Sequence, residues 1–249
     1  MTPKLTIIIP AYNEEKRIPK TLNSYLEYLR KKIDFEILVV INGCIDNTLG
    51  IIEEIAKKNK EIKYIDIGKV ASKGVAVTEG FKIADSDLIG FVDADLATPP
   101  DAFYNLIEQI EDYDAIIASR WMKGAKIHEH QPLTRIVAGR SFNFLVNLLF
   151  NLKIKDTQCG AKLFRKQAIK SIINDIGKTR WAFDVDVLYL LKRKGYKTKE
   201  IPTEWNEPGG SHVKLKTVLE MFLSIIRLRL IYSPFKFIVS MYNRVKNVL

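Results

Sequence analysis

Two carboxylates separated by one small residue end an apolar run at Asp93 and Asp95. The run 88–92 predicts a buried strand, and two prolines at 99–100 close the turn that follows. Carboxylates at the C-terminal end of such a strand face the crevice in which open α/β sheets bind ligands. Two oxygen ligands with open positions suit Mg²⁺ or Mn²⁺, which usually binds through one or two carboxylates plus substrate phosphates. The spacing therefore predicts a metal site for nucleotide-sugar chemistry, and a solvated acidic loop is the alternative for an isolated motif of this kind.

Three further strand ends carry groups that suit a nucleotide. After the first strand, Pro10 ends the pairing, Tyr12 can stack on a base and Glu14 can accept hydrogen bonds from base or ribose. After the second strand, Asn42 opens a turn. Lys73 stands beside a glycine at a predicted helix start, which is a ready anion site. The segment after the first strand, taken alone, is equally well read as an ordinary helix start.

The elements that position these groups alternate along the first half of the chain. Strands are expected at 5–10, 35–41, 62–67, 88–92 and 115–118, and helices at 19–30, 47–58, 74–84 and 100–110. Asp46 and Thr98 are the expected helix N-caps. This alternation predicts an α/β fold with a mostly parallel sheet, flanked by helices, that binds ligands at its C-terminal edge.

Charge is unevenly distributed over the 249 residues, whose net charge is +10. Residues 1–119 hold 14 Lys and Arg against 20 Asp and Glu, whereas residues 120–249 hold 25 against 9. A half this basic favours a polyanionic partner, namely nucleic acid, an anionic membrane or a phosphorylated ligand. We expect no nucleic-acid partner, because zinc-finger spacing and aromatic RNA-binding motifs are missing from the sequence. The two cysteines, Cys44 and Cys159, indicate a reducing compartment, and the N-terminus does not read as a signal peptide.

Two C-terminal stretches are amphipathic. Residues 133–152 and 217–248 are rich in apolar and aromatic side chains, but charged residues interrupt both before the roughly 18 uncharged residues that a membrane span needs. Interleaved aromatic and cationic residues favour helices that lie in a membrane interface, and ordinary packing on the core is the alternative. We therefore expect a peripheral or monotopic protein without a transmembrane span.

Three later segments narrow the class of protein. They are Asp-Thr-Gln-Cys-Gly-Ala-Lys-Leu-Phe at 156–164, Arg-Trp-Ala-Phe-Asp-Val at 180–185 and Trp-Asn-Glu-Pro-Gly-Gly-Ser at 205–211. With these segments and the four strand ends, the chain resembles the family 2 glycosyltransferases of the GT-A fold, over about residues 4 to 232. Within that family it most resembles the dolichyl-phosphate β-glucosyltransferases, and the dolichyl-phosphate mannose synthases are the nearest relatives.

The resemblance implies roles for individual residues. Asp93 and Asp95 would hold the metal against the donor diphosphate. The other implied positions are nucleotide ligands at Pro10, Tyr12, Glu14, Asn42 and Lys73, acceptor-phosphate ligands at Arg120, Arg135, Arg140 and Ser141, and a sugar and acceptor pocket at Asp156, Gln158 and Asp184. Asp156 and Asp184 are alternatively helix caps, or partners for Arg135 and Arg180.

The sequence departs from the family pattern at several positions. Many relatives carry two consecutive aspartates where this chain has Ile41-Asn42, and an amide both donates and accepts, so the preferred base stays open. Ala97 stands where mannose synthases often have a glutamine, which leans away from the mannose branch. Ser211-His212 replaces the usual Ser-Lys.

The expected reaction is inverting transfer of glucose from UDP-glucose to dolichyl or polyprenyl phosphate at the cytoplasmic face of a membrane. The expected domains are a GT-A catalytic domain at 1–211 and amphipathic membrane-interface helices at 212–249. The alternatives are a GDP-mannose donor, a saccharide acceptor for which Asp184 would be the base, and a non-catalytic membrane-associated binder. A dehydrogenase is disfavoured because no G-x-G-x-x-G follows the first strand.

Overall fold

A seven-stranded sheet forms the centre of the computed structural model, which describes residues 3–68, 72–128, 132–177, 181–206, 215–234 and 236–237. In spatial order its strands are β3 (Ile62–Asp66), β2 (Phe35–Ile41), β1 (Leu5–Ala11), β4 (Leu88–Phe91), β7 (Lys162–Arg165), β5 (Ala115–Ser119) and β8 (Thr198–Pro202). A small parallel pair, β6 (Lys126–Ile127) with β9 (Glu204–Trp205), lies beside it. The first five strands match the expected ones to within one residue at each end.

One strand runs against the others. β7 pairs antiparallel with both β4 and β5, whereas the pairs β1–β2, β1–β4, β2–β3 and β5–β8 are parallel. The expectation of a mostly parallel sheet is thus confirmed. The C-terminal ends of β1, β2, β4 and β5 therefore share one edge of the sheet with the N-terminal end of β7.

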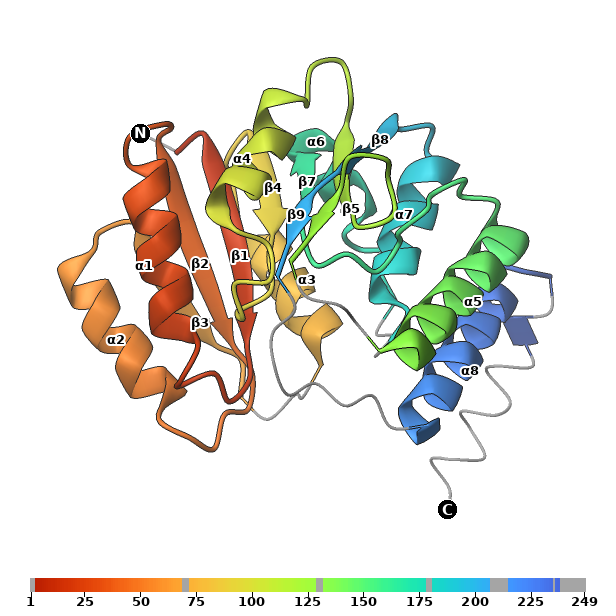
Figure 1. Ribbon diagram of the computed structural model, residues 1–249, viewed down its shortest axis with the longest axis horizontal. Helices are drawn as coiled ribbons and strands as arrows, with labels where there is room; N and C mark the ends of the chain where they lie inside the picture. Colours follow the sequence, from red (N-terminus) through yellow and green to blue (C-terminus); the bar gives the residue numbers. More distant parts are fainter. Residues whose placement is uncertain are drawn as a thin grey trace.

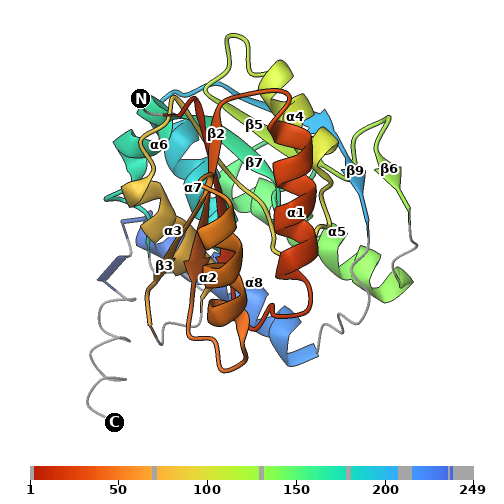
Figure 2. The same ribbon diagram turned by 90° about the vertical axis from the view of Figure 1, so that its left-hand side faces the viewer.

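Helices cover both faces of the sheet, with α1 and α3 on opposite sides (Figures 1 and 2). One face carries α1 (Ile18–Leu29), α2 (Thr48–Lys58) and α4 (Pro100–Glu108), and the other carries α3 (Lys73–Ile83), α6 (Lys166–Ile172) and α7 (Phe183–Arg193). Successive residues of β1 alternate between the two cores: Ile7 and Ile9 belong to the first and Ile8 to the second. Both helical layers thus hold the same rigid sheet.

The helix starts show one correction to the sequence analysis. Asp46 and Thr98 are not the N-caps: α2 is preceded by Asn47 and α4 by Pro99, and neither side chain caps its helix. Asp46 instead accepts hydrogen bonds from the N–H of Thr48, at 3.1 Å, and from its hydroxyl, at 2.5 Å. A carboxylate two residues upstream therefore stabilises the start of α2, one position earlier than a cap.

Two long helices, α5 (Leu133–Phe150) and α8 (Leu215–Ile231), lie side by side at the end of the molecule far from α1 and α2 (Figure 1). Phe142, Val146 and Phe150 of α5 pack against Ile225 and Leu228 of α8 in a third apolar cluster. Other apolar side chains of the two helices stay exposed: Leu133, Val137, Phe144 and Leu148 on α5, and Leu219, Leu223 and Ile226 on α8. Each helix therefore joins the core through one face and leaves another apolar face uncovered by the described residues.

A buried polar contact fastens the end of α8 to α7. The hydroxyl of Tyr232 donates to Oδ1 of Asp186 at 2.5 Å, and the N–H of Gly177 donates to Oδ2 at 2.7 Å. Burial raises the pKa of Asp186 to about 6, although both hydrogen bonds act in the opposite direction.

Among the residues that the structure describes, no helix combines the length and the apolar character that a membrane span requires. The expected domain boundary between residues 211 and 212 lies outside the described residues, as do Arg180 and Ser211-His212. The division into two units stays a prediction.

Candidate active site

The acidic pair lies at the C-terminal edge of the sheet, directly after β4. Leu96 takes a left-handed backbone conformation (φ 59°), which is costly for a residue with a branched side chain. The turn brings the N–H of Ala97 to 3.1 Å from Oδ1 of Asp95. Burial, and then repulsion from Asp93, raise the pKa of Asp95. Two carboxylates held together against their mutual repulsion form an arrangement that a cation would stabilise.

Lys73 supplies such a cation. It is the first residue of α3, and its Nζ lies 2.5 Å from Oδ1 of Asp93. Burial alone would lower the pKa of Lys73, but attraction from Asp93, Asp184 and Asp95 outweighs burial and raises it. Lys73 is therefore held as an ammonium ion beside the acidic pair.

The segment before β7 shapes the other side of Asp93. A Cβ atom on Gly160 would overlap Oδ2 of Asp93, so only glycine lets the carboxylate lie in this position. In the same way, a Cβ on Gly74 would come within 2.7 Å of the Cβ of Phe183, which begins α7. Gly160 thus lets the segment before β7 pack against the turn that carries Asp93 and Asp95, called here the D-x-D turn. Gly74 lets the first residue of α7 pack against the start of α3.

Two buried ion pairs involve residues next to this edge of the sheet. Lys162 is fully buried, and its Nζ donates to Oδ1 of Asp184 at 2.5 Å and to the carbonyl of Cys159 at 2.6 Å. Arg120 donates to both oxygens of Asp156 through Nε (2.8 Å) and Nη2 (2.9 Å). Asp156 therefore pairs with Arg120 and Asp184 with Lys162, partners that the sequence alternatives did not name.

Glu200 on β8 holds the loop that carries Asp156. Its two carboxylate oxygens accept hydrogen bonds from the backbone N–H groups of Lys155 (2.9 Å) and Asp156 (2.8 Å).

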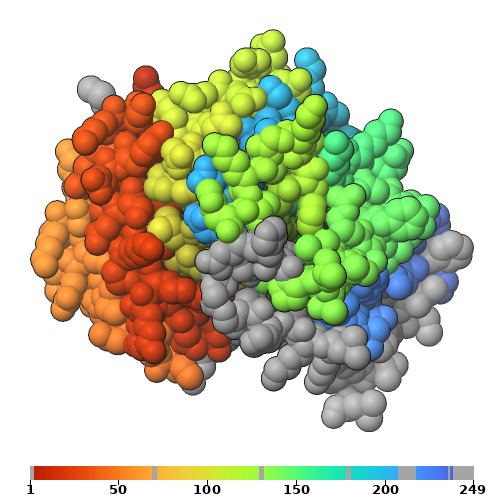
Figure 3. Space-filling model, viewed as in Figure 1, coloured from red at the N-terminus to blue at the C-terminus, as the bar shows by residue number. Residues whose placement is uncertain are grey.

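The strand β9 contacts the same part of the site. The guanidinium of Arg120 lies 5.2 Å from the ring centroid of Trp205. The β9 segment lies between the D-x-D turn and β6 on the surface shown in Figure 3, and the N–H of Asn206 donates to Ala97 at 2.8 Å. Distant parts of the sequence thus fix one wall of the site.

The first two strand ends are tied to each other. The N–H of Glu14 donates to the hydroxyl of Thr48 at 2.8 Å, and Asn13 accepts from the N–H of Ile45 at 2.9 Å. Burial, followed by repulsion from Asp95 and Asp93, raises the pKa of Glu14, although its ion pair with Arg17 opposes the shift. Glu14 therefore lies within electrostatic reach of Asp93 and Asp95, so this strand end belongs to the same site.

Three buried polar atoms have no hydrogen-bond partner within the described part of the chain: Oδ1 of Asn42, Oγ of Ser72 and Nε2 of Gln158. Buried polar groups are nearly always satisfied, so such atoms mark places where a ligand or water completes the structure. Asn42 and Gln158 are two of the residues predicted from sequence, whereas Ser72 was missed although it precedes Lys73. Tyr12 is half exposed and open to stacking.

Three of the predicted acceptor-phosphate residues, Arg135, Arg140 and Ser141, lie on α5. The guanidinium of Arg140 lies 5.2 Å from the ring centroid of Trp121, which connects α5 to the end of β5. Ser141 is exposed and Arg135 is half-buried on the same helix. Their roles stay predictions.

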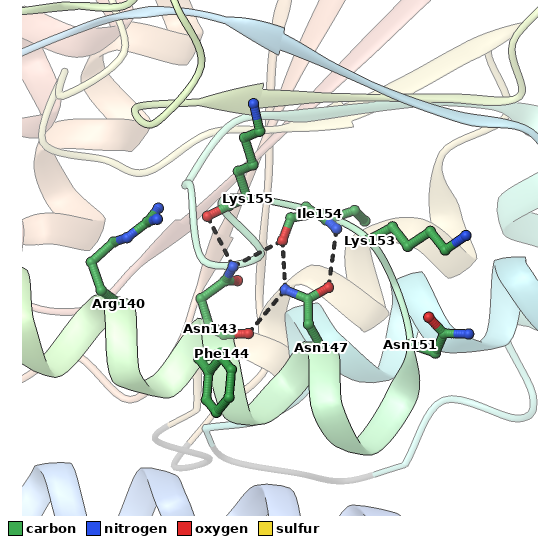
Figure 4. Close-up of a pocket in the computed structure, with 8 residues that line it drawn as sticks. All are labelled: Arg140, Asn143, Phe144, Asn147, Asn151, Lys153, Ile154 and Lys155. Carbon is green, nitrogen blue, oxygen red and sulfur yellow. Dashed lines mark hydrogen bonds between the residues drawn. The ribbon is translucent and has the colours of Figure 1, made fainter.

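A cavity of about 320 Å³ lies beside Arg140, between α5 and the loop 151–155. Its floor is a network in which Asn143 and Asn147 bind the backbone of Ile154 and Lys155 (Figure 4). The basic side chains around it, of Arg140, Lys153 and Lys155, extend in different directions rather than converging on one point (Figure 4). The network's evident role is to hold the loop that leads into Asp156.

Several residues that build the site were not predicted from the sequence. Gly160, Lys162, Glu200 and Asn143 position its carboxylates and loops without lying at an expected strand end. A lysine inside the apolar run 161–164 was the available signal for Lys162, because a buried lysine needs a carboxylate partner.

Comparison with known proteins agrees with this geometry. Residues 6–173 match the model of the family described as Glycosyl transferase family 2. A dolichyl-phosphate beta-glucosyltransferase of Trichomonas vaginalis is 33% identical over 240 residues, covering 92% of this chain and 73% of the relative. The human dolichyl-phosphate beta-glucosyltransferase is 30% identical over 247 residues, covering 93% and 76%.

Solved structures share the fold. Glucosyl-3-phosphoglycerate synthase from Mycobacterium tuberculosis, crystallised with Mn²⁺, UDP and phosphoglyceric acid, superposes with a TM-score of 0.67 at 16% identity, covering 92% of this chain and 78% of that one. The same enzyme has also been crystallised with Mg²⁺ and UDP. The chain belongs to glycosyltransferase family 2: it is a glycosyltransferase with the GT-A fold that resembles the dolichyl-phosphate β-glucosyltransferases.

Proposed function

We propose that this enzyme transfers glucose from UDP-glucose to dolichyl or another polyprenyl phosphate, with inversion at the anomeric carbon. The observation that carries the proposal is the acidic pair Asp93 and Asp95, held beside Lys73 at the sheet edge where Asn42 and Gln158 present unsatisfied polar atoms. The names of relatives at 30% to 33% identity support the donor sugar and the lipid acceptor.

The donor nucleotide would lie across the ends of β1 and β2. Oδ1 of Asn42 would accept a base N–H, and Tyr12 would stack on the base. Nε2 of Gln158 would donate to a sugar hydroxyl, and Lys73 would pair with the diphosphate. The unsatisfied atoms of Asn42 and Gln158 support these assignments, because binding would satisfy them.

The residues present fit a divalent cation. Asp93 and Asp95 offer hard oxygen ligands, and burial together with repulsion from Asp93 raises the pKa of Asp95. No group of three His, Cys, Asp or Glu residues that could hold a metal occurs within the described ranges, so substrate and water would complete the coordination, as Mg²⁺ usually requires. A bound Mg²⁺ or Mn²⁺ would neutralise charge on the leaving diphosphate.

The acceptor phosphate is already an anion near neutral pH, so the site needs cations to position it rather than a strong base. Arg135, Arg140 and Ser141 of α5 are the proposed ligands. Arg120 contributes a fixed guanidinium, although its clamp with Asp156 neutralises much of its charge. Asp184 is buried and its Oδ1 accepts a hydrogen bond from the ammonium of Lys162, which counts against it as the base that a saccharide acceptor would need.

The membrane surface is the proposed partner of the exposed apolar faces of α5 and α8. Phe144 and Leu148 are 71% and 68% exposed on α5, a helix whose only charged residues are arginines. Apolar side chains beside cations suit an interface with anionic lipid headgroups. A lipid acceptor would keep its tail in that bilayer, next to the proposed phosphate ligands. The cytoplasmic face stays a prediction from the free cysteines.

A transfer assay tests the proposal. Purified protein in detergent receives Mg²⁺, dolichyl phosphate and radiolabelled UDP-glucose or GDP-mannose in separate reactions, and label is counted in the organic phase. We expect label from UDP-glucose alone, and loss of that label with EDTA or in Asp95→Asn. Asp112→Asn removes an exposed carboxylate before β5 and should leave transfer unchanged.

Each other outcome has a defined meaning. Label from GDP-mannose alone would move the enzyme to the mannose branch, and full turnover by Asp95→Asn would refute the metal assignment. Arg135→Ala should raise KM for the lipid phosphate more than KM for the donor, and the reverse would refute its placement.

A further inference from the structure

The ammonium of Lys73 and a metal ion would compete for the same carboxylate oxygen of Asp93. Nζ of Lys73 lies 2.5 Å from Oδ1 of Asp93, an oxygen of the first carboxylate of the metal motif. The two residues come from different elements, α3 and the turn after β4, so the contact depends on the folded sheet edge. A side-chain cation therefore already binds an oxygen to which a metal would bind.

The surroundings fix this pair in place. Gly160 lies against Oδ2 of Asp93, so the carboxylate turns its other oxygen toward Lys73. Nζ of Lys73 lies 5.5 Å from the ring centroid of Phe91, within cation–π distance. Asp184 and Asp95 add attraction from further away. The ammonium, on a side chain that is 36% exposed, thus lies between a carboxylate and an aromatic ring.

We propose that Lys73 is a resident counter-ion for the acidic pair, which leaves Asp93 when the metal binds and then pairs with the diphosphate of the donor. The proposal rests on the function proposed above. An ammonium and a divalent cation on the same carboxylate oxygen would repel each other at a few ångströms. The incoming diphosphate supplies the anion that Lys73 needs after it leaves Asp93.

This exchange makes metal and nucleotide binding cooperative. Without nucleotide, metal binding must displace Lys73 into a site that offers it no new anion, so binding is weak. With nucleotide, Lys73 moves from one anion to another, so binding is stronger. The coupling is reciprocal, because the metal must then improve nucleotide binding by the same factor.

The test measures Mn²⁺ binding directly, by electron paramagnetic resonance of the free ion, with and without UDP. A neighbouring opposite charge changes the proton affinity of a carboxylate by about 10- to 1000-fold, so removing it should strengthen binding of another cation by about tenfold or more. We expect Lys73→Met to bind Mn²⁺ at least about tenfold more tightly than the wild type without UDP, and to lose most of the gain that UDP gives the wild type.

Two further variants separate charge from structure. Lys73→Arg keeps the cation and should keep weak Mn²⁺ binding without UDP. Lys82→Met removes a lysine from the last turn of the same helix, where it pairs with Glu79, and should match the wild type. Both keep the helix and test whether the effect belongs to the charge at position 73.

The failures are distinguishable. If the wild type binds Mn²⁺ with UDP but Lys73→Met binds Mn²⁺ alone no more tightly, the counter-ion role is wrong and the metal site stands. If neither protein binds Mn²⁺ even with UDP, the metal assignment of the proposed function is overturned, and the role of Lys73 with it.

Discussion

The clamp between Arg120 and Asp156 predicts strong energetic coupling. The side chain of Asp156 is 3% exposed and that of Arg120 is 18% exposed, and Arg120 gives the carboxylate three hydrogen bonds, of 3.0 Å from its backbone N–H, 2.8 Å from Nε and 2.9 Å from Nη2. Removing one member of a buried ion pair costs about 3–5 kcal/mol, because the remaining charge stays buried without its partner. Arg120→Met keeps only the backbone bond, so we expect a loss of about 3–5 kcal/mol of unfolding free energy.

The double variant Arg120→Met with Asp156→Leu removes both charges together. Replacing a buried pair by apolar residues is often close to neutral, so the double variant should lose less than Arg120→Met alone. Urea unfolding followed by far-UV circular dichroism measures the loss of unfolding free energy in Arg120→Met, in Asp156→Leu and in the double variant. This signal is preferable to fluorescence, since Trp205 lies against Arg120 and reports local changes.

Additive losses would refute this reasoning. They would mean that the two residues do not stabilise each other, which would leave the guanidinium of Arg120 available to substrate. A control cycle on the exposed pair of Lys166 and Asp85, with an Nζ to Oδ1 distance of 2.6 Å, should show far smaller coupling.

Three other predictions concern different parts of the molecule. Gly160→Ala should displace the carboxylate of Asp93 and lower transfer by about 100-fold or more, while circular dichroism stays that of a folded protein; unchanged transfer would contradict the packing. Because the pKa of Asp186 rises to about 6 on folding, its contribution to stability is full below about pH 4 and is lost as pH rises through about 6. Relative to Asp186→Asn, the unfolding free energy of the wild type should therefore rise by up to about 1.4 kcal/mol for each unit that the pH falls between those values. Urea unfolding at a series of pH values measures this difference, and parallel plots of unfolding free energy against pH for the two proteins would exclude the shift. Phe144→Glu should weaken sedimentation with anionic vesicles about tenfold or more, whereas Ile83→Glu, at an exposed site on α3, should not; equal binding by both variants would remove α5 from the membrane surface.

Much of the sheet edge was predictable from the sequence, because local patterns determine it. The apolar runs that became β1 to β5 end in polar residues, and parallel strands bring those ends to one edge. Periodicity therefore placed Asp93 at this edge and Lys73 at the start of a helix, and the structure brings these two residues into contact.

The remainder depends on contacts between residues far apart in the sequence. β7 is four residues long and begins with a buried lysine, so its pattern does not identify a strand. Its place between β4 and β5 depends on pairing with both. The partners of Asp156 and Asp184 could not be read from spacing either, since Arg120 lies 36 residues from one and Lys162 lies 22 from the other. Long-range pairing, and not local propensity, decided these positions.

The antiparallel strand β7 has a consequence for how the active site forms during folding. β4 and β5 do not pair with each other in the sheet order, because β7 lies between them. In an emerging chain the strands β3, β2, β1 and β4 can pair with one another early. They join β5 and β8 only after β7, which ends at residue 165, is available. The turn at Gly160 that packs against Asp93 arrives with the same segment. Pairing over such separations is slow, so the site is completed late in folding, after much of the N-terminal core is in place. An N-terminal fragment that stops before β7 would contain the whole acidic motif and still lack the wall that shapes it.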